Sequence, residues 1–202
     1  MPTIVETDRI GKKFVLGEYS IIRKNVSIGD DTEIREHCVI GSLPFTFSEK
    51  GLLSEQKRLT QTGKTIIGNN VYISCFSNVS LGSTMDTIIE DYVLMNAYVM
   101  VGHDVHIHKY AELMNGVIAC GYSSIGENTF VGVGTVIRNR VKIGKNCKIG
   151  MGSVVVKDIP DGVIAFGNPC TVQGSNTLPT LALRKIVREA KKIGNTLKKD
   201  VV

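Results

Sequence analysis

The sequence predicts an all-β solenoid, a narrow prism built from short stacked strands, and three observations support this class. Aliphatic residues recur at every sixth position over most of the chain, glycine often follows them, and only 6% of the 202 residues are aromatic. A period of six fits neither an α-helix nor a simple alternating strand. It fits a triangular coil in which each hexad forms one short strand and one corner, and the coils stack in parallel at about 4.8 Å. The number of hexads predicts about seven coils.

The hexad register runs in three blocks, over residues 4–40, 67–79 and 89–155. We expect the aliphatic residue of each hexad to point into the prism. The residue two positions before it is usually small or β-branched, as a narrow interior requires. A glycine after the aliphatic residue lets the backbone turn closely. The solenoid domain is therefore expected to span residues 1–170.

Two insertions interrupt the register. The longer is a loop over residues 41–66, and its Phe45 and Phe47 are expected to pack against a neighbouring chain or the substrate. The shorter is the excess GSTMDT between the second and third blocks. Long loops in such folds are usually functional, and a loop without a role is the alternative. Both insertions precede residues 101–108 by about one to three coils, so they are candidates to line the same groove.

Residues 178–200 predict a basic amphipathic helix. From residue 178 onward, seven Lys or Arg and two Asp or Glu supply the whole net charge of +5, so the rest of the chain is neutral. We expect this helix to cap the open end of the solenoid. A basic face that meets phosphates or an acidic protein partner is the alternative. The neutral body, without interleaved aromatic and basic residues, argues against a nucleic-acid partner.

The composition predicts a cytoplasmic protein. No stretch approaches about 18 uninterrupted apolar residues, so no membrane span is expected. The first residues, MPTIVETDRIG, lack the apolar run of a signal peptide. The five cysteines are scattered and form no CxxC pair, which is typical of buried thiols in a reducing compartment.

The stretch VGHDVHIH, residues 101–108, holds three of the four histidines. A catalytic zinc site needs three protein ligands and an open position. No histidine lies between His37 and His103, so the expected ligand set is incomplete and no metal is predicted. A general base is favoured, because the pKa of histidine lies near neutral pH and an adjacent carboxylate such as Asp104 fixes the tautomer. A surface histidine without a role is the alternative.

Gly121 follows His103 by 18 residues, so stacking places it one coil further along the prism. Its backbone N–H is then a candidate donor to an oxyanion that develops beside the base.

The pattern [Ile/Leu/Val]-Gly-x-x-[small]-x resembles that of the hexapeptide-repeat acyltransferases, which fold as left-handed parallel β-helices, and among them the nucleotide-sugar N-acetyltransferases. The resemblance covers nearly the whole chain to about Pro169. It implies a homotrimer with active sites between subunits. It also implies that His103 is the base, that Asp104 orients it, and that Asn96 contacts the acceptor sugar. Glu112 stands where some relatives carry a second histidine, which is a departure from the pattern.

The closing segment, MGSVVVKDIPDGVIAFGNPC, resembles that of acetyl-CoA-dependent members, with Thr171 in place of their usual cation. The resemblance implies acetyl-CoA as the acyl donor. The residues expected to contact the donor are Gly121, Val133, Gly150, Gly152, Gly167, Asn168 and Pro169. A Gly-Asn-Pro turn that merely ends the solenoid is the alternative.

Together these features predict an acetyltransferase that moves acetyl from acetyl-CoA to the amine of a nucleotide-linked amino sugar in surface-polysaccharide biosynthesis. N- and O-acetylation remain open. One alternative is an acyl-carrier-protein-dependent sugar N-acyltransferase of the lipid A type, which the loop after Ile40 and the basic tail resemble. The others are a zinc protein like the γ-carbonic anhydrases, which share this fold and have two histidines spaced as His103 and His108 are, and a non-catalytic trimeric scaffold.

Overall fold

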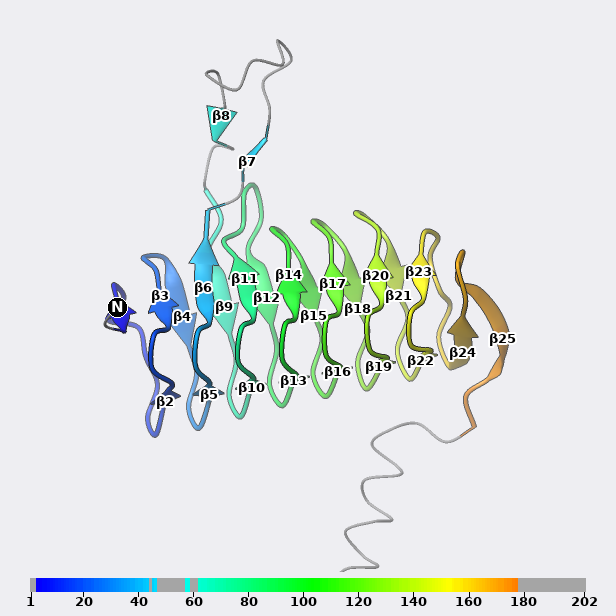
Figure 1. The fold of residues 1–202 in the computed structure, drawn as a ribbon, viewed down its shortest axis with the longest axis horizontal. Helices are drawn as coiled ribbons and strands as arrows, with labels where there is room; N and C mark the ends of the chain where they lie inside the picture. The colour runs from blue at the N-terminus through cyan, green and yellow to red at the C-terminus, as the bar shows by residue number, and fades with distance from the viewer. Residues whose placement is uncertain (1–2, 44, 47–56, 59–61, 178–202) are drawn as a thin grey trace, which may run out of the picture.

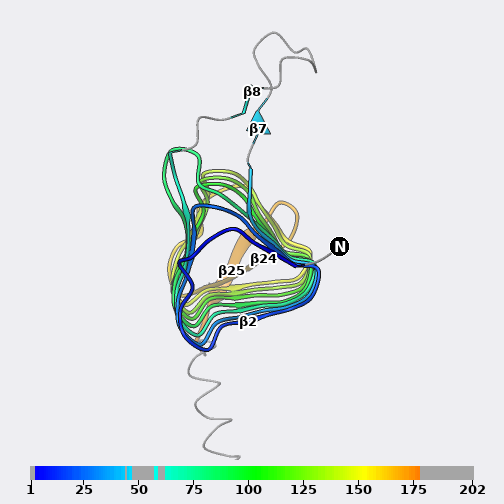
Figure 2. The same ribbon diagram turned by 90° about the vertical axis from the view of Figure 1, so that its left-hand side faces the viewer.

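The computed structural model describes residues 3–43, 45–46, 57–58 and 62–177, and these residues form one long solenoid (Figure 1). Short strands follow one another around three sides of the prism, and each side is a sheet. Seen along its length, the prism has a triangular outline (Figure 2). The all-β solenoid predicted from the hexads is confirmed.

Sheet A lies on one side of the prism and has eight strands. They are β1 (Ile4–Val5), β3 (Ile21–Ile22), β6 (Val39–Ser42), β11 (Asn78–Ser80), β14 (Met100–Val101), β17 (Ile118–Ala119), β20 (Val136–Ile137) and β23 (Val154–Val155).

Sheet B follows sheet A in each coil and has six strands. They are β4 (Val26–Ile28), β9 (Thr65–Ile67), β12 (Thr87–Ile89), β15 (His106–Ile107), β18 (Ser124–Ile125) and β21 (Lys142–Ile143).

Sheet C closes the triangle with nine strands. They are β2 (Val15–Leu16), β5 (Glu33–Ile34), β10 (Tyr72–Ile73), β13 (Leu94–Met95), β16 (Glu112–Leu113), β19 (Phe130–Val131), β22 (Lys148–Ile149), β24 (Val163–Phe166) and β25 (Thr171–Ser175). The last of these, β25, runs antiparallel to β24. A separate antiparallel pair, β7 (Phe45–Thr46) and β8 (Lys57–Arg58), projects from the prism (Figure 2).

Parallel pairing between successive coils fixes the register. Met100 pairs with Ile118, and Val101 pairs with Ala119, which is a step of one full coil. In the coils without insertions, a residue 18 positions later therefore lies directly beside its predecessor. Across the GSTMDT insertion the step is longer, and Asn78 pairs with Met100.

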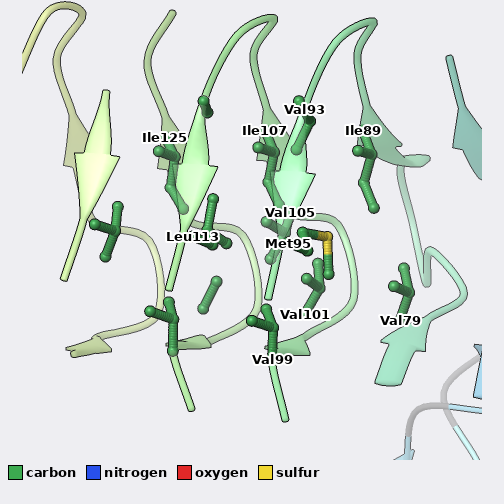
Figure 3. Close-up of a cluster of buried hydrophobic side chains, with 14 of the residues drawn as sticks. Val79, Ile89, Val93, Met95, Val99, Val101, Val105, Ile107, Leu113 and Ile125 are labelled. Carbon is green, nitrogen blue, oxygen red and sulfur yellow. The ribbon is translucent and has the colours of Figure 1, made fainter. Parts of the chain in front are cut away.

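The interior is a column of aliphatic side chains (Figure 3). The predicted inward residues from Ile22 to Val155 are buried, and Ile107, Leu113 and Ile125 have no exposed surface. Ile4 keeps 36% of its surface, because its coil is covered on one side only. Burying such side chains stabilises the fold by about 1.5–3 kcal/mol each relative to leaving them exposed.

Most corners turn at a residue in the left-handed backbone region. On the corner between sheets A and B, the A–B corner, these residues include Asp104, Tyr122 and Arg140, with φ of 58°, 62° and 65°. On the corner between sheets C and A, the C–A corner, this position holds a side chain up to Tyr98 and a glycine in the later coils, at Gly116, Gly134 and Gly152.

One detail differs from expectation, and another lies outside the described residues. Sheet A has eight strands, which gives about eight turns instead of about seven. The expected helix over 178–200 lies outside the described residues, and the described part contains no helix. Among the described residues no helix has the length and apolarity needed to cross a bilayer.

Candidate active site

The A–B corner brings together three segments that are far apart in the sequence. Strands β6, β11 and β14 are neighbours in sheet A, and each leads into this corner. The long insertion leaves after β6, the GSTMDT insertion leaves after β11, and His103 follows β14. The expectation that the shorter insertion lines the same region as His103 is confirmed by the contacts below.

His103 and Asp104 form the centre of this corner. The Nδ1 atom of His103 lies 2.6 Å from Oδ2 of Asp104. The Asp104 side chain has no exposed surface, whereas the His103 ring keeps 26% of its own. The pair therefore has a buried anchor and a ring that substrate can reach.

The short insertion surrounds the Asp104 carboxylate with donors. Backbone N–H groups of Ser83, Thr84 and Met85 donate to it at 3.2, 3.0 and 2.5 Å, and the Ser83 hydroxyl donates to Oδ2. The Asp104 amide in turn donates to Thr87 Oγ1 at 2.9 Å. The GSTMDT insertion thus fixes the Asp104 carboxylate, which in turn contacts the His103 ring.

These donors decide the charge of Asp104. Burial alone would raise its pKa, but the hydrogen bonds from the Ser83 hydroxyl, the Met85 amide and His103 outweigh burial and place the pKa below its ordinary value. The carboxylate is therefore ionised at neutral pH. An ionised partner at Nδ1 fixes the proton there and leaves Nε2 as the lone-pair atom that accepts a proton.

Gly121 lies against the face of the His103 ring. A Cβ at this position would lie 2.8 Å from both Cε1 and Nε2 of His103, so only glycine leaves room for the ring. Within the described residues, the Gly121 amide donates no backbone hydrogen bond. An N–H without a backbone acceptor beside an imidazole is an arrangement that can stabilise an oxyanion.

Tyr122 and Arg140 complete the corner, and sequence reasoning missed both. The Tyr122 ring meets His103 edge-on, with ring centroids 5.0 Å apart. Its hydroxyl lies 3.3 Å from Ser83 Oγ. The Arg140 guanidinium lies 4.4 Å from the Tyr122 ring centroid. The sequence did hold a signal for them. Tyr122 and Arg140 follow Asp104 at steps of 18 residues, which places all three at the same corner position.

The other predicted site residues lie at the C–A corner. Asn96 follows β13, and its Nδ2 lies 3.3 Å from Met114 Sδ. The predicted donor contacts at this corner are Val133, Gly150, Gly152 and the segment Gly167-Asn168-Pro169. The Gly167 carbonyl accepts a bond from Val154 N at 3.0 Å, which fixes that segment on β23. Within one chain, His103 and Gly121 are thus together, and Asn96 and the remaining residues are on another corner.

The side chains of the two loop phenylalanines lie outside the described part of the chain. The backbone of Phe45 pairs with Arg58 in the β7–β8 pair, and Phe47 lies outside the described residues. Their predicted substrate contacts stay predictions.

The three histidines of VGHDVHIH divide into two groups. His103 turns to Asp104, whereas His106 and His108 both turn to Glu90. The three rings therefore do not form one group, because His103 contacts Asp104 and the other two contact Glu90.

Comparison with known proteins agrees with the repeat and the fold. Residues 122–157 match the family model described as bacterial transferase hexapeptide, six repeats. The chain is 34% identical over 74% of its length to an acyl-[acyl-carrier-protein]–UDP-N-acetylglucosamine O-acyltransferase from Nautilia profundicola, of which it covers 56%. It is 28% identical over 67% of its length to a UDP-3-O-acylglucosamine N-acyltransferase from Herminiimonas arsenicoxydans, of which it covers 38%.

A solved structure shares the fold. LpxA from Acinetobacter baumannii superposes with a TM-score of 0.74 at 22% identity, over 91% of this chain and 72% of that one. The chain spans about half the length of the first curated relatives it matches. These relatives are acyltransferases named for acyl carrier protein or for acylglucosamine. They support the resemblance to acyltransferases, but not the narrower one to nucleotide-sugar N-acetyltransferases.

Proposed function

We propose that this chain is a sugar acyltransferase in which His103 is the general base. The observation that carries the proposal is the His103 ring, held at Nδ1 by the buried Asp104 and packed over the open amide of Gly121. A base beside an unused N–H donor is the arrangement that acyl transfer from a thioester needs. A scaffold would have no use for it.

The reaction is a direct transfer. Nε2 of His103 takes the proton from the hydroxyl or amine of the acceptor, and the acceptor atom attacks the thioester carbonyl. The carbonyl π electrons move onto oxygen, and the Gly121 N–H stabilises this oxyanion. When the oxyanion collapses, the carbon–sulfur bond breaks and the imidazolium gives its proton to the leaving thiolate. Asp104 stabilises the imidazolium while it exists.

The proposed donor is an acyl group on acyl carrier protein. This was the alternative in the sequence analysis, and the relatives support it better than acetyl-CoA. The proposed acceptor is a UDP-linked glucosamine derivative, because both groups of relatives are named for one. Acetyl-CoA is the second candidate, and the Gly167-Asn168-Pro169 ending is what favours it.

The division of predicted residues between two corners supports a site shared by subunits. Gly134 and Gly152 leave the later C–A corner without side chains, and no atom lies within 4 Å of where a Cβ would be. Such a bare edge suits the extended thioester arm of a donor. In a homotrimer, this edge of one subunit would face His103 of the next.

The test is a donor and acceptor panel read by mass spectrometry. The donors are acyl carrier protein with short and long acyl chains, and acetyl-CoA. The acceptors are UDP-N-acetylglucosamine, UDP-3-O-acylglucosamine and UDP-linked amino sugars. The proposal expects acylation from acyl carrier protein with wild type and with His37→Ala, and a rate at least about 10²-fold lower with His103→Ala. Acetylation from acetyl-CoA alone would overturn the donor assignment, and product formation by His103→Ala at a rate near that of wild type would overturn the base.

A further inference from the structure

Outside the candidate active site, three ligand-type side chains converge on the outer face of sheet B. Oε1 of Glu90 lies 2.7 Å from Nε2 of His106 and 3.0 Å from Nδ1 of His108. All three ligand atoms lie within 4.8 Å of one another. The two imidazole rings stack with centroids 3.9 Å apart.

The strand geometry explains why these residues meet. His106 and His108 are two positions apart around the inward Ile107, so both point outward from the same strand. Ile89 pairs with Ile107, which brings Glu90 beside His108 on the neighbouring coil. A pair of ligands on one strand and a third on the next is a rigid platform, because the hydrogen-bonded sheet fixes the spacing.

The carboxylate is already oriented by the backbone. Oε2 of Glu90 accepts the Lys109 amide at 3.0 Å, which leaves Oε1 directed at both rings. Hydrogen bonds of this kind hold metal ligands in position. The three side chains remain about one-third exposed, and His108 also borders a groove of ≈ 650 Å³ on this face, so an ion reaches them from solvent.

We propose that Glu90, His106 and His108 bind one divalent transition-metal ion of the zinc class. Two imidazole nitrogens and one carboxylate oxygen are ligands that Zn²⁺ prefers, at about 2.0–2.2 Å, and three protein ligands leave a coordination position open to water. The ion takes the place of the two hydrogen-bond contacts between Oε1 of Glu90 and the rings. It joins two adjacent coils of sheet B, close in sequence to His103. The sequence alone predicted no metal because no third histidine stands at the expected spacing, and Glu90 is the third ligand in this proposal.

The test measures Zn²⁺ and Co²⁺ binding to the full chain after chelator treatment. We expect one ion per chain by elemental analysis and a rise in the melting temperature when Zn²⁺ is added. Glu90→Gln and His106→Asn should each weaken binding at least about tenfold. His37→Asn is the matched control, since His37 stacks between Tyr19 and Phe76 and should not change binding.

Several results would overturn the site. They are no binding at micromolar Zn²⁺, equal binding by wild type and the Glu90→Gln variant, or loss of binding in His37→Asn. Sulfur-to-cobalt charge-transfer bands in the Co²⁺ spectrum would assign the ion to cysteine instead and would also overturn it. Circular dichroism of each variant confirms that the solenoid is intact.

Discussion

At the scale of single residues, the candidate site depends on one close contact and one buried charge. Gly121 is required because the His103 ring occupies the space that a Cβ would take. Asp104 is required because its carboxylate contacts Nδ1 of His103. Among the described residues, no other anionic group does so. The 18-residue spacing predicted Gly121, and adjacency in sequence predicted Asp104.

Gly121→Ala tests the close contact. The added methyl would force the His103 ring to move, and a displacement of this order costs about 10²-fold in rate. We expect kcat to fall by that amount with little change in the melting temperature. Gly174→Ala is the control, because no atom lies within 4 Å of a Cβ built there. An unchanged kcat in Gly121→Ala would contradict the close packing of the His103 ring against Gly121.

Asp104→Asn tests the buried charge through pH. The pKa of Asp104 is lowered in the folded chain, so its ionised form stabilises the fold above the ordinary carboxyl pKa of about 4. That contribution is lost as the pH falls through the lower, folded pKa. Wild type should therefore be more stable than the variant at neutral pH, and the difference in free energy of unfolding should shrink below about pH 4. A difference that does not depend on pH would exclude a charge effect.

At the scale of elements, the solenoid was predictable and the corner contacts were not. The hexads predict where Ile107 and its equivalents point, because period and pairing fix the backbone. They do not predict that GSTMDT folds its amides around Asp104, since this depends on how a loop of one coil meets the next. Tyr122, Arg140 and Glu90 were missed for the same reason: their roles come from neighbours in adjacent coils.

Ser83→Ala tests the supporting loop. The Ser83 hydroxyl donates to a buried carboxylate, and a hydrogen bond to a charged group contributes about 1.5–3 kcal/mol. We expect a loss of stability in that range in denaturant unfolding and a lower kcat with the KM for acceptor unchanged. Ser124→Ala, on the outer face of sheet B, should change neither. A kcat equal to that of wild type in Ser83→Ala would show that the Ser83 hydrogen bond to Asp104 does not affect catalysis.

At the scale of the whole molecule, a single chain holds its predicted site residues on two corners. His103 and Gly121 lie at the A–B corner, whereas Asn96 and Val133 lie at the C–A corner. Sheet A separates the C–A corner from the A–B corner within one chain. The proposal therefore places the second half of the site on a neighbouring copy.

Mixing two defective variants tests this sharing. His103→Ala removes the base, and Val133→Trp fills the exposed C–A edge, where Val133 keeps 49% of its surface. Each variant alone should be inactive or weak. Co-assembled from the two chains, some sites should contain an intact base facing an intact edge, and activity should return. No recovery in mixed oligomers confirmed by sedimentation would place the whole site within one chain.

The measurement closest to the central claim is the steady-state rate of acyl transfer by His103→Ala beside wild type and His37→Ala, with the preferred acyl donor. The account predicts that kcat of His103→Ala falls by about 10²–10⁴-fold, because a general base contributes that much. The KM for donor should stay near the wild-type value, and His37→Ala should match wild type. A kcat within about threefold of wild type in His103→Ala would contradict the assignment of His103 as the base.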